Sequence, residues 1–187
     1  DISGHGTSAA FNMAQLKGVF QALILLNLEI KDLLNQANTA LSRCLEKNIF
    51  LTLTLIFIDT DKNKVEIGRA GHCPTIYYSS QNKKTEYIKT KGLGLGILRN
   101  NNYSQHIETY TRNYTSNDVI LLYTDGLVEA KNNQNQEYGY KKVIDTAKKV
   151  MHQSPVKIVK STVHSMYKFC DEVIPEDDIT CLCIKLN

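Results

Sequence analysis

Residues 51–123 form a series of short segments with strand-like alternation, separated by tight turns. We predict strands over 51–58 and 65–70 around the turn at 59–64, and over 75–79 and 85–89 around the turn at 80–84. Two further strands are predicted over 105–111 and 118–123. Because connections of a few residues cannot hold a crossover helix, neighbouring strands are expected to pair antiparallel.

Helical periodicity flanks this strand-rich region. Helices are predicted over 9–26 and 29–46, and again over 140–152 and 155–170, before a last strand over 179–186. In the first helix the apolar positions are Phe11, Ala14, Leu16, Val19, Phe20 and Leu23. Helices segregated from strands indicate an α+β fold. We therefore expect a layered α-β-β-α sandwich of mainly antiparallel sheets flanked by helices.

The composition is that of a folded domain. The chain has 187 residues, of which 42% are hydrophobic and 22% charged, which is not the pattern of a disordered chain. We predict one domain over 1–187, without an internal repeat or linker. The net charge of +3 is too small to favour nucleic acid as a partner.

Two features bear on the compartment. The five cysteines form no CxxC pair, so we expect buried free thiols in a reducing compartment: Cys44, Cys73, Cys170, Cys181 and Cys183. The longest unbroken apolar run, 22–26, is far too short to cross a bilayer. A cytoplasmic domain without membrane contact is the expectation, although a full-length protein could carry a membrane anchor.

Acidic residues stand at three junctions between strands and turns. Asp1 opens the sequence DISGHG, Asp125 follows the apolar strand 119–123, and Asp177 and Asp178 precede the last strand. A carboxylate at the end of a buried strand must face water, a cation or a basic group. If these strand ends meet at one edge, the converging carboxylates require divalent cations, and oxygen ligands favour Mg²⁺ or Mn²⁺ over Zn²⁺. Taken alone, the pair Asp125-Gly126 could be an ordinary turn and the pair Asp177-Asp178 could simply begin a strand, so the prediction depends on the sites occurring together.

The set of motifs resembles the SpoIIE/RsbU-type bacterial branch of the metal-dependent, protein phosphatase 2C-like serine/threonine phosphatases. The matching segments occur in the family's order and span nearly the whole chain: 1–6 (DISGHG), 9–10, 13–14, 70–74 (AGHCP), 92–96 (GLGLG), 123–130 (YTDGLVEA), 138–139 (YG) and 177–180 (DDIT). Small departures are Leu95 in the glycine loop and Cys73 in the AGHCP segment. The family also has an N-terminal segment, with a strand and its own acidic residue, before the first motif. We therefore expect a fragment that is truncated at its N-terminus.

The resemblance implies a site with two Mn²⁺ or Mg²⁺ ions. Asp1 would bridge the ions and the carbonyl of Ile2 would bind one of them, while Asp125 and Asp177 would complete the ligands, with Asp178 as a further metal-site residue. A metal-bound hydroxide would attack phosphorus in line with the serine or threonine oxygen. His5 would act near the metals or as a proton donor to the leaving alkoxide, or would be an exposed turn residue. His72 is expected to be structural, holding the turn after its strand.

The resemblance also implies the partners. The expected substrate is a phosphorylated protein, in this branch usually an anti-sigma-factor antagonist, and the full-length protein is expected to carry an upstream sensor domain. The sequence does not predict an oligomeric state. One alternative is a regulatory or binding module of the same fold with weak catalysis. Another is a different metallohydrolase such as a phosphodiesterase, which would need a His-rich ligand set that the sequence does not contain. The glycine loop 92–96 does not fit a dinucleotide-binding motif.

Overall fold

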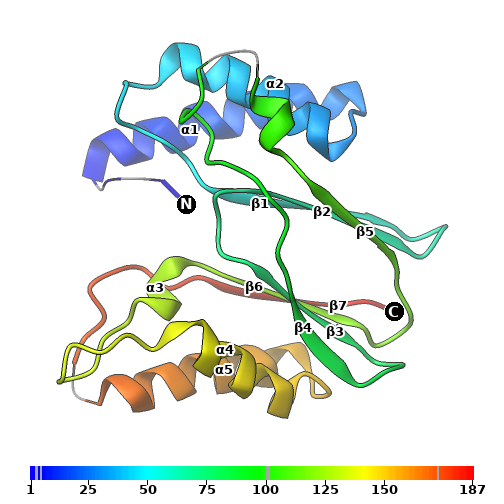
Figure 1. Ribbon diagram of the computed structural model, residues 1–187, viewed down its shortest axis with the longest axis vertical. Coiled ribbons are helices and arrows are strands. Elements are labelled where there is room, and N and C mark those ends of the chain that lie inside the picture. The colour runs from blue at the N-terminus through cyan, green and yellow to red at the C-terminus, as the bar shows by residue number, and fades with distance from the viewer. Residues whose placement is uncertain (3, 5, 100–101, 172) are drawn as a thin grey trace. The chain divides into compact units, whose positions relative to one another are not determined.

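A computed structural model describes residues 1–2, 4, 6–99, 102–171 and 173–187. The chain forms two compact units (Figure 1). Unit 1 comprises Asp1–His72 and Thr90–Asn113, and unit 2 comprises Cys73–Lys89 and Tyr114–Asn187. Each unit has its own antiparallel sheet and its own hydrophobic core.

Unit 1 combines a helical pair with a three-stranded sheet. The helices are α1 (Gly6–Leu23), which continues as the 3₁₀ turn η1 (Ile24–Leu26), and α2 (Ile30–Cys44). The sheet has the order β1-β2-β5, with β1 (Leu53–Asp59), β2 (Lys64–Ala70) and β5 (Thr109–Asn113), and a 3₁₀ turn η2 (Tyr103–His106) precedes β5. All the strand pairs in this sheet are antiparallel.

The amphipathic helix α2 supplies one wall of the unit 1 core. Its buried residues recur every three or four positions and are Ile30, Leu33, Leu34, Ala37, Asn38 and Leu41. Gly68 of β2 lies directly beneath Ile30, where a Cβ atom would collide with the isoleucine side chain. A glycine is therefore needed here for α2 to approach the sheet.

Helix α1 differs from its sequence-based prediction. Of its six predicted apolar positions only Leu16 is buried, while Val19, Phe20 and Leu23 pack partly against the unit 1 core. Phe11 is 68% exposed and Ala14 is also exposed, so their helical spacing does not place either residue in the unit 1 core. The helical spacing predicted the element correctly, but the apolar surface of this helix exceeds what unit 1 covers.

Unit 2 contains a four-stranded sheet with the order β4-β3-β6-β7. The strands are β3 (Thr75–Ser79), β4 (Lys84–Ile88), β6 (Val119–Tyr123) and β7 (Cys181–Lys185). Three helices complete the unit, namely the single turn α3 (Asp125–Val128), α4 (Gly139–Val150) and α5 (Pro155–Cys170). Helices α4 and α5 pack against each other and contact the outer strands β4 and β7 (Figure 1).

A buried carboxylate, Asp118, fixes the start of the central strand β6. Its two oxygens accept hydrogen bonds from the hydroxyl of Tyr77 at 2.5 Å and the amide of Ser80 at 2.7 Å, and from the amide and hydroxyl of Thr115, each at 3.1 Å. Burial alone would raise the pKa of Asp118, but these hydrogen bonds outweigh it and hold the pKa below its ordinary value of 3.8. The ionised carboxylate therefore stabilises the folded unit.

The predicted α+β class, with mainly antiparallel sheets flanked by helices, is confirmed. Most elements lie within a few residues of their predicted bounds, and α5 matches its prediction at both ends. Two predictions differ. The strand expected over 105–111 begins only at Thr109, because Tyr103–His106 forms a 3₁₀ turn, and the one-turn helix α3 was not predicted.

The compartment expectations are only partly met. The helix spanning Gly6–Leu26 is long and apolar enough by composition to cross a membrane, although its longest unbroken apolar run is short. A signal sequence or the core helix of a soluble protein passes the same test, so this finding alone does not decide the location. All five cysteines are free thiols. Cys73 and Cys170 are buried as expected, whereas Cys44 is exposed.

Candidate metal centre

The first acidic motif lies in unit 1, beside the segment that leads into β1. The amino group of Asp1 donates to the carbonyl of Thr52 at 2.8 Å, and the amide of Thr52 donates back to the carbonyl of Asp1 at 2.8 Å. Ile2 forms an isolated antiparallel bridge with Leu51 and donates its amide to the Asp1 carboxylate at 2.9 Å. Asp1 itself is exposed, so this pairing presents its carboxylate at an accessible strand end.

The second acidic motif lies at the end of β6 in unit 2. Thr124 follows the strand, and Asp125 is the first residue of α3. The Asp125 carboxylate accepts a hydrogen bond from the amide of Gly126 at 3.0 Å and is half-buried. Because β6 is a buried central strand and α3 turns sharply away from it, Asp125 is held at the edge of the sheet.

The third acidic motif meets the second through the pairing of β6 with β7. These strands are antiparallel with Tyr123 opposite Cys181, so the end of β6 lies beside the start of β7. The segment before β7 contains Asp177 and Asp178, whose local hydrogen bond joins the Asp178 amide to the Asp177 carboxylate at 2.8 Å. The topology therefore brings the Asp125 turn and the 177–178 segment to the same edge of the unit 2 sheet.

The hydroxyl of Thr124 joins the two segments. It donates to the carbonyl of Asp178 at 3.2 Å and accepts from the amide of Thr180 at 2.9 Å, instead of capping α3. The amide of Thr124 also donates to the carbonyl of Thr180 at 3.1 Å. These three hydrogen bonds fix the backbone of the last motif relative to that of the Asp125 turn.

Close backbone packing strengthens the same joint. A Cβ atom on Gly126 would lie 2.5 Å from the carbonyl oxygen of Asp178, closer than real Cβ contacts come. The glycine of the Asp-Gly pair is therefore required here by the approach of the 177–178 segment. Its role goes beyond that of an ordinary turn residue.

A pocket of about 190 Å³ opens at this joint and is rich in carboxylates. Its acidic lining residues are Glu129, Glu137, Glu176 and Asp177. The pKa of Glu129 is raised, first by partial burial and then by repulsion from Asp125, Glu137 and Asp177. Burial and the neighbouring carboxylates together therefore disfavour the ionised form of Glu129, against the opposing effect of Lys131.

The predicted site residues thus fall into three groups. Asp1 and Ile2 belong to unit 1, whereas Asp125, Asp177 and Asp178 belong to unit 2 and meet at one joint. His5 lies outside the described residues. Among the residues that the structure describes, no three His, Cys, Asp or Glu side chains gather closely enough to hold a metal ion. Every predicted ligand is an oxygen donor, which is the donor type that Mg²⁺ and Mn²⁺ prefer.

The sequence did not predict that Thr124 joins the two acidic segments of unit 2 or that Glu129 lines the pocket. Glu129 lies four residues after Asp125, and its amide donates to the Asp125 carbonyl at 2.9 Å, so the i, i+4 spacing could have paired the two. The joining role of Thr124 could not be predicted from the spacing of residues along the sequence, because it depends on the register between β6 and β7.

Other motif residues support the backbone around these sites. His72 lies 3.0 Å from the Thr52 hydroxyl through its Nδ1 atom, and its carbonyl accepts from Arg69, which agrees with the structural role expected for it. The glycine loop is anchored to α2 by Asn38, whose amide oxygen accepts from Gly96 at 2.9 Å and whose amide nitrogen donates to the carbonyl of Leu98 at 2.8 Å.

Comparisons with known proteins identify the family of the chain. The family described as "Stage II sporulation protein E (SpoIIE)" matches residues 1–187. Phosphoserine phosphatase RsbU of Bacillus subtilis (strain 168) is 26% identical over 188 residues, covering 99% of this chain and 53% of RsbU. The chain thus spans about half the length of this curated relative.

Solved structures share the fold at low sequence identity. The SiaA-PP2C domain of Pseudomonas aeruginosa superposes with a TM-score of 0.84 at 15% identity, covering 100% of this chain and 73% of that one. The structure of the PP2C phosphatase domain with a regulatory fragment of SpoIIE from Bacillus subtilis gives a TM-score of 0.78 at 18% identity, covering 98% and 52%. The whole-chain family match and these folds lead to one conclusion: the chain belongs to the SpoIIE family, in the SpoIIE/RsbU-type branch of the metal-dependent serine/threonine protein phosphatases.

Proposed function

We propose that this chain hydrolyses phosphoserine or phosphothreonine in a protein substrate with the help of two Mn²⁺ or Mg²⁺ ions. The observation that carries the proposal is the joint at which Thr124 and Gly126 hold the Asp125 turn against the 177–178 segment. This joint positions two carboxylates of the family's motifs at one sheet edge, beside an acidic pocket.

The proposed ligands are Asp1, the carbonyl of Ile2, Asp125 and Asp177. The residues of unit 2 suit such ions chemically, since the donors are oxygens and the pKa of Glu129 is raised first by burial and then by repulsion from neighbouring carboxylates. Bound divalent ions would supply an activated water and would neutralise charge on the phosphoryl oxygens.

The chain's own residues have distinct parts in this proposal. Asp125 and Asp177 would hold the ions, and Thr124 joins the backbone segments that carry these two carboxylates through its hydrogen bonds. Asp178 contributes its carbonyl to the joint, and its carboxylate is proposed as a further metal-site residue. His5 is proposed as a group near the metals or as the proton donor to the leaving alkoxide.

The proposed substrate is a phosphorylated anti-sigma-factor antagonist in bacterial partner switching, and the proposed setting is the cytoplasm. The support is the likeness to RsbU, which is described as a phosphoserine phosphatase. A regulatory partner or sensor domain elsewhere in the full-length protein is proposed on the same basis. The alternative remains a binding module of the same fold with weak catalysis.

The test is Mn²⁺-dependent hydrolysis of a phosphoserine-containing protein, followed by phosphate release, in the unaltered chain and in the Asp177→Asn variant. We expect activity to need the metal and to fall at least about 100-fold in the variant, because a direct metal ligand is lost. Asp171→Asn is the matched control, since Asp171 is exposed after α5 and already has the positive φ of 57° that asparagine tolerates. Equal activity in all three proteins would contradict the ligand assignment, and no activity in any of them would favour the binding module.

A further inference from the structure

Helices α4 and α5 have a high net positive charge. Residues 139–171 contain seven lysines and two aspartates, whereas the whole chain has a net charge of only +3. The remainder of the chain is therefore slightly acidic. Since α4 and α5 lie side by side in unit 2, this charge is concentrated on one helical pair (Figure 1).

A groove of about 340 Å³ runs between these two helices. Three lysines line it, Lys142 and Lys149 from α4 and Lys168 from α5, and all three are exposed. The groove thus has cationic groups on both of its walls.

Hydroxyl groups from three different segments also line the groove. The hydroxyl of Tyr138 donates to that of Ser165 at 2.8 Å and lies 3.1 Å from that of Thr146, and the last two are 3.1 Å apart. Hydroxyl hydrogens can rotate toward a new acceptor, so Thr146 and Ser165, which are half-buried, can donate to a carboxylate that enters the groove.

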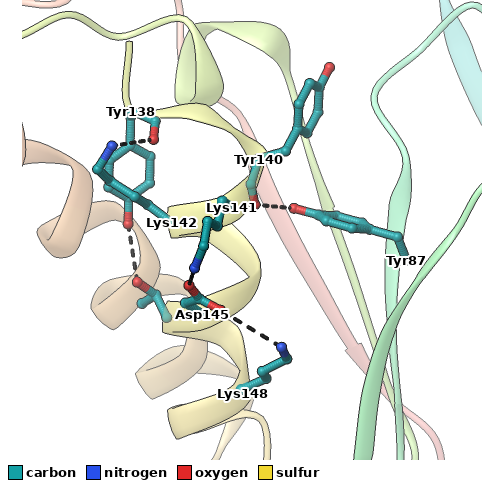
Figure 2. A network of polar contacts seen from close by, with 8 residues as sticks. Tyr87, Tyr138, Tyr140, Lys141, Lys142, Asp145 and Lys148 are labelled. Carbon is teal, nitrogen blue, oxygen red and sulfur yellow. Dashed lines mark hydrogen bonds and ion pairs between the residues drawn. The ribbon is translucent and has the colours of Figure 1, made fainter. Parts of the chain in front are cut away.

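One acidic residue, Asp145, also lines the groove, and it is already paired. Asp145 accepts from Lys141 at 2.6 Å and lies 3.7 Å from the ammonium of Lys148, as Figure 2 shows. Lys142 donates to the carbonyl of Tyr138 at 3.1 Å (Figure 2). Its ammonium also lies 4.4 Å from the centre of the Phe169 ring.

Two groove lysines have no such compensation. In the part of the chain that the structure describes, no hydrogen-bond acceptor or carboxylate pairs with Lys149 or Lys168. The groove therefore has uncompensated positive charge together with hydroxyl donors.

We propose that this groove is a docking site for an acidic, carboxylate-rich segment of a protein partner. The exposed lysines supply only donors toward the groove, the hydroxyls can add further donors, and the one carboxylate in the lining, Asp145, is already paired, so carboxylates of a partner are the matching acceptors. Opposite charge on a partner would also speed its association and favour it over neutral segments. The inference does not depend on the catalytic proposal, because none of the groove residues is a proposed metal ligand.

Other occupants fit the groove less well. A second copy of the chain that docks symmetrically would bring the same lysines against each other. A nucleic acid binds through many phosphate contacts and through stacking on exposed aromatic rings, whereas this groove has three lysines, no arginine and only the half-buried ring of Phe169 beside the buried Tyr138. A flat bilayer meets protruding side chains more readily than the floor of a groove between helices.

The test is fluorescence anisotropy with a labelled glutamate-rich peptide of about twelve residues, about 18 Å long as a helix and thus comparable to α4. Chelator is present throughout, so that binding is measured without metal and a failure of the catalytic proposal cannot affect it. The groove variant is Lys149→Glu/Lys168→Glu. The matched control is Lys157→Glu/Lys160→Glu, which makes the same charge change in unit 2 at exposed lysines that do not line the groove.

We expect the groove variant to bind the peptide at least about tenfold more weakly and the control less than about threefold more weakly, at low salt. Circular dichroism checks folding, and Lys149→Gln/Lys168→Gln, which only neutralises the charges, should lose less affinity than the reversal. An equal loss of affinity in Lys149→Glu/Lys168→Glu and in Lys157→Glu/Lys160→Glu would overturn the proposal, because the peptide would then be attracted by the overall positive charge of the helices and not by the groove. Tighter binding to phosphatidylserine vesicles or to duplex DNA than to the peptide would overturn it in favour of those partners.

Discussion

Replacement of Thr124 by valine removes the hydroxyl that joins the two acidic segments of unit 2. Valine keeps the shape and the β-branching of threonine, so the extended backbone before α3 is not disturbed. Two hydrogen bonds disappear, those to the Asp178 carbonyl and from the Thr180 amide. At about 0.5–1.5 kcal/mol each, and with Thr180 exposed to water, the free energy of unfolding should fall by about 1–2 kcal/mol.

The same change should loosen the position of Asp177 relative to Asp125. Loss of a group that orients a metal ligand typically weakens metal binding by about 10- to 100-fold. We therefore expect Thr124→Val to bind Mn²⁺ at least about tenfold more weakly in calorimetry, while urea unfolding reports the stability. Thr124→Ser is the matched control because it keeps the hydroxyl, and it should bind the metal almost as the unaltered chain does. Equal Mn²⁺ affinity in all three proteins would refute the positioning role.

Three further predictions concern the backbone and the cores. Gly126→Ala should lower the free energy of unfolding by about 2 kcal/mol or more in urea titrations, because the new Cβ would collide with the Asp178 carbonyl; unchanged stability would contradict this packing. Asp118→Asn should lower the free energy of unfolding at neutral pH, and the difference from the unaltered chain should shrink between about pH 5 and pH 3. The reason is that a carboxylate with a lowered pKa stabilises the fold only while it is ionised. A difference that does not change with pH would contradict this role. Asn38→Ala should lose about 2 kcal/mol, because the amide of Gly96 would lose its buried acceptor; a loss below about 0.5 kcal/mol in urea unfolding would contradict the anchor.

Elements with a long, regular pattern could be predicted from the sequence. Helix α2 repeats its apolar positions over four turns, and five of its six buried residues are the hydrophobic ones that the period predicts. The sixth, Asn38, breaks the pattern because its amide serves the glycine loop. The hairpin of β3 and β4 was also predictable, since two short strands flank a polar turn in which Lys83 adopts a φ of 51°.

Short elements and contacts between distant segments were harder to predict. Helix α3 is a single turn that contains a glycine, so it has neither the length nor the propensity for a helical signal. Helix α1 showed a helical pattern, yet the exposure of Phe11 depends on which neighbours cover the helix, and that is a property of the tertiary structure. Asp125 and Asp177 were both placed at strand ends by sequence, but their common edge follows from the register of β6 with β7.

The central claim is that Asp125 is a ligand of the catalytic metal ions, and calorimetric titration with Mn²⁺ tests it most directly. The comparison is between the unaltered chain, Asp125→Asn and the control Asp171→Asn, which changes an exposed carboxylate after α5 in the same way. We expect the unaltered chain and the control to bind Mn²⁺ alike and Asp125→Asn to bind it at least about tenfold more weakly. Equal Mn²⁺ affinity in all three proteins, or no binding by any of them, would contradict it.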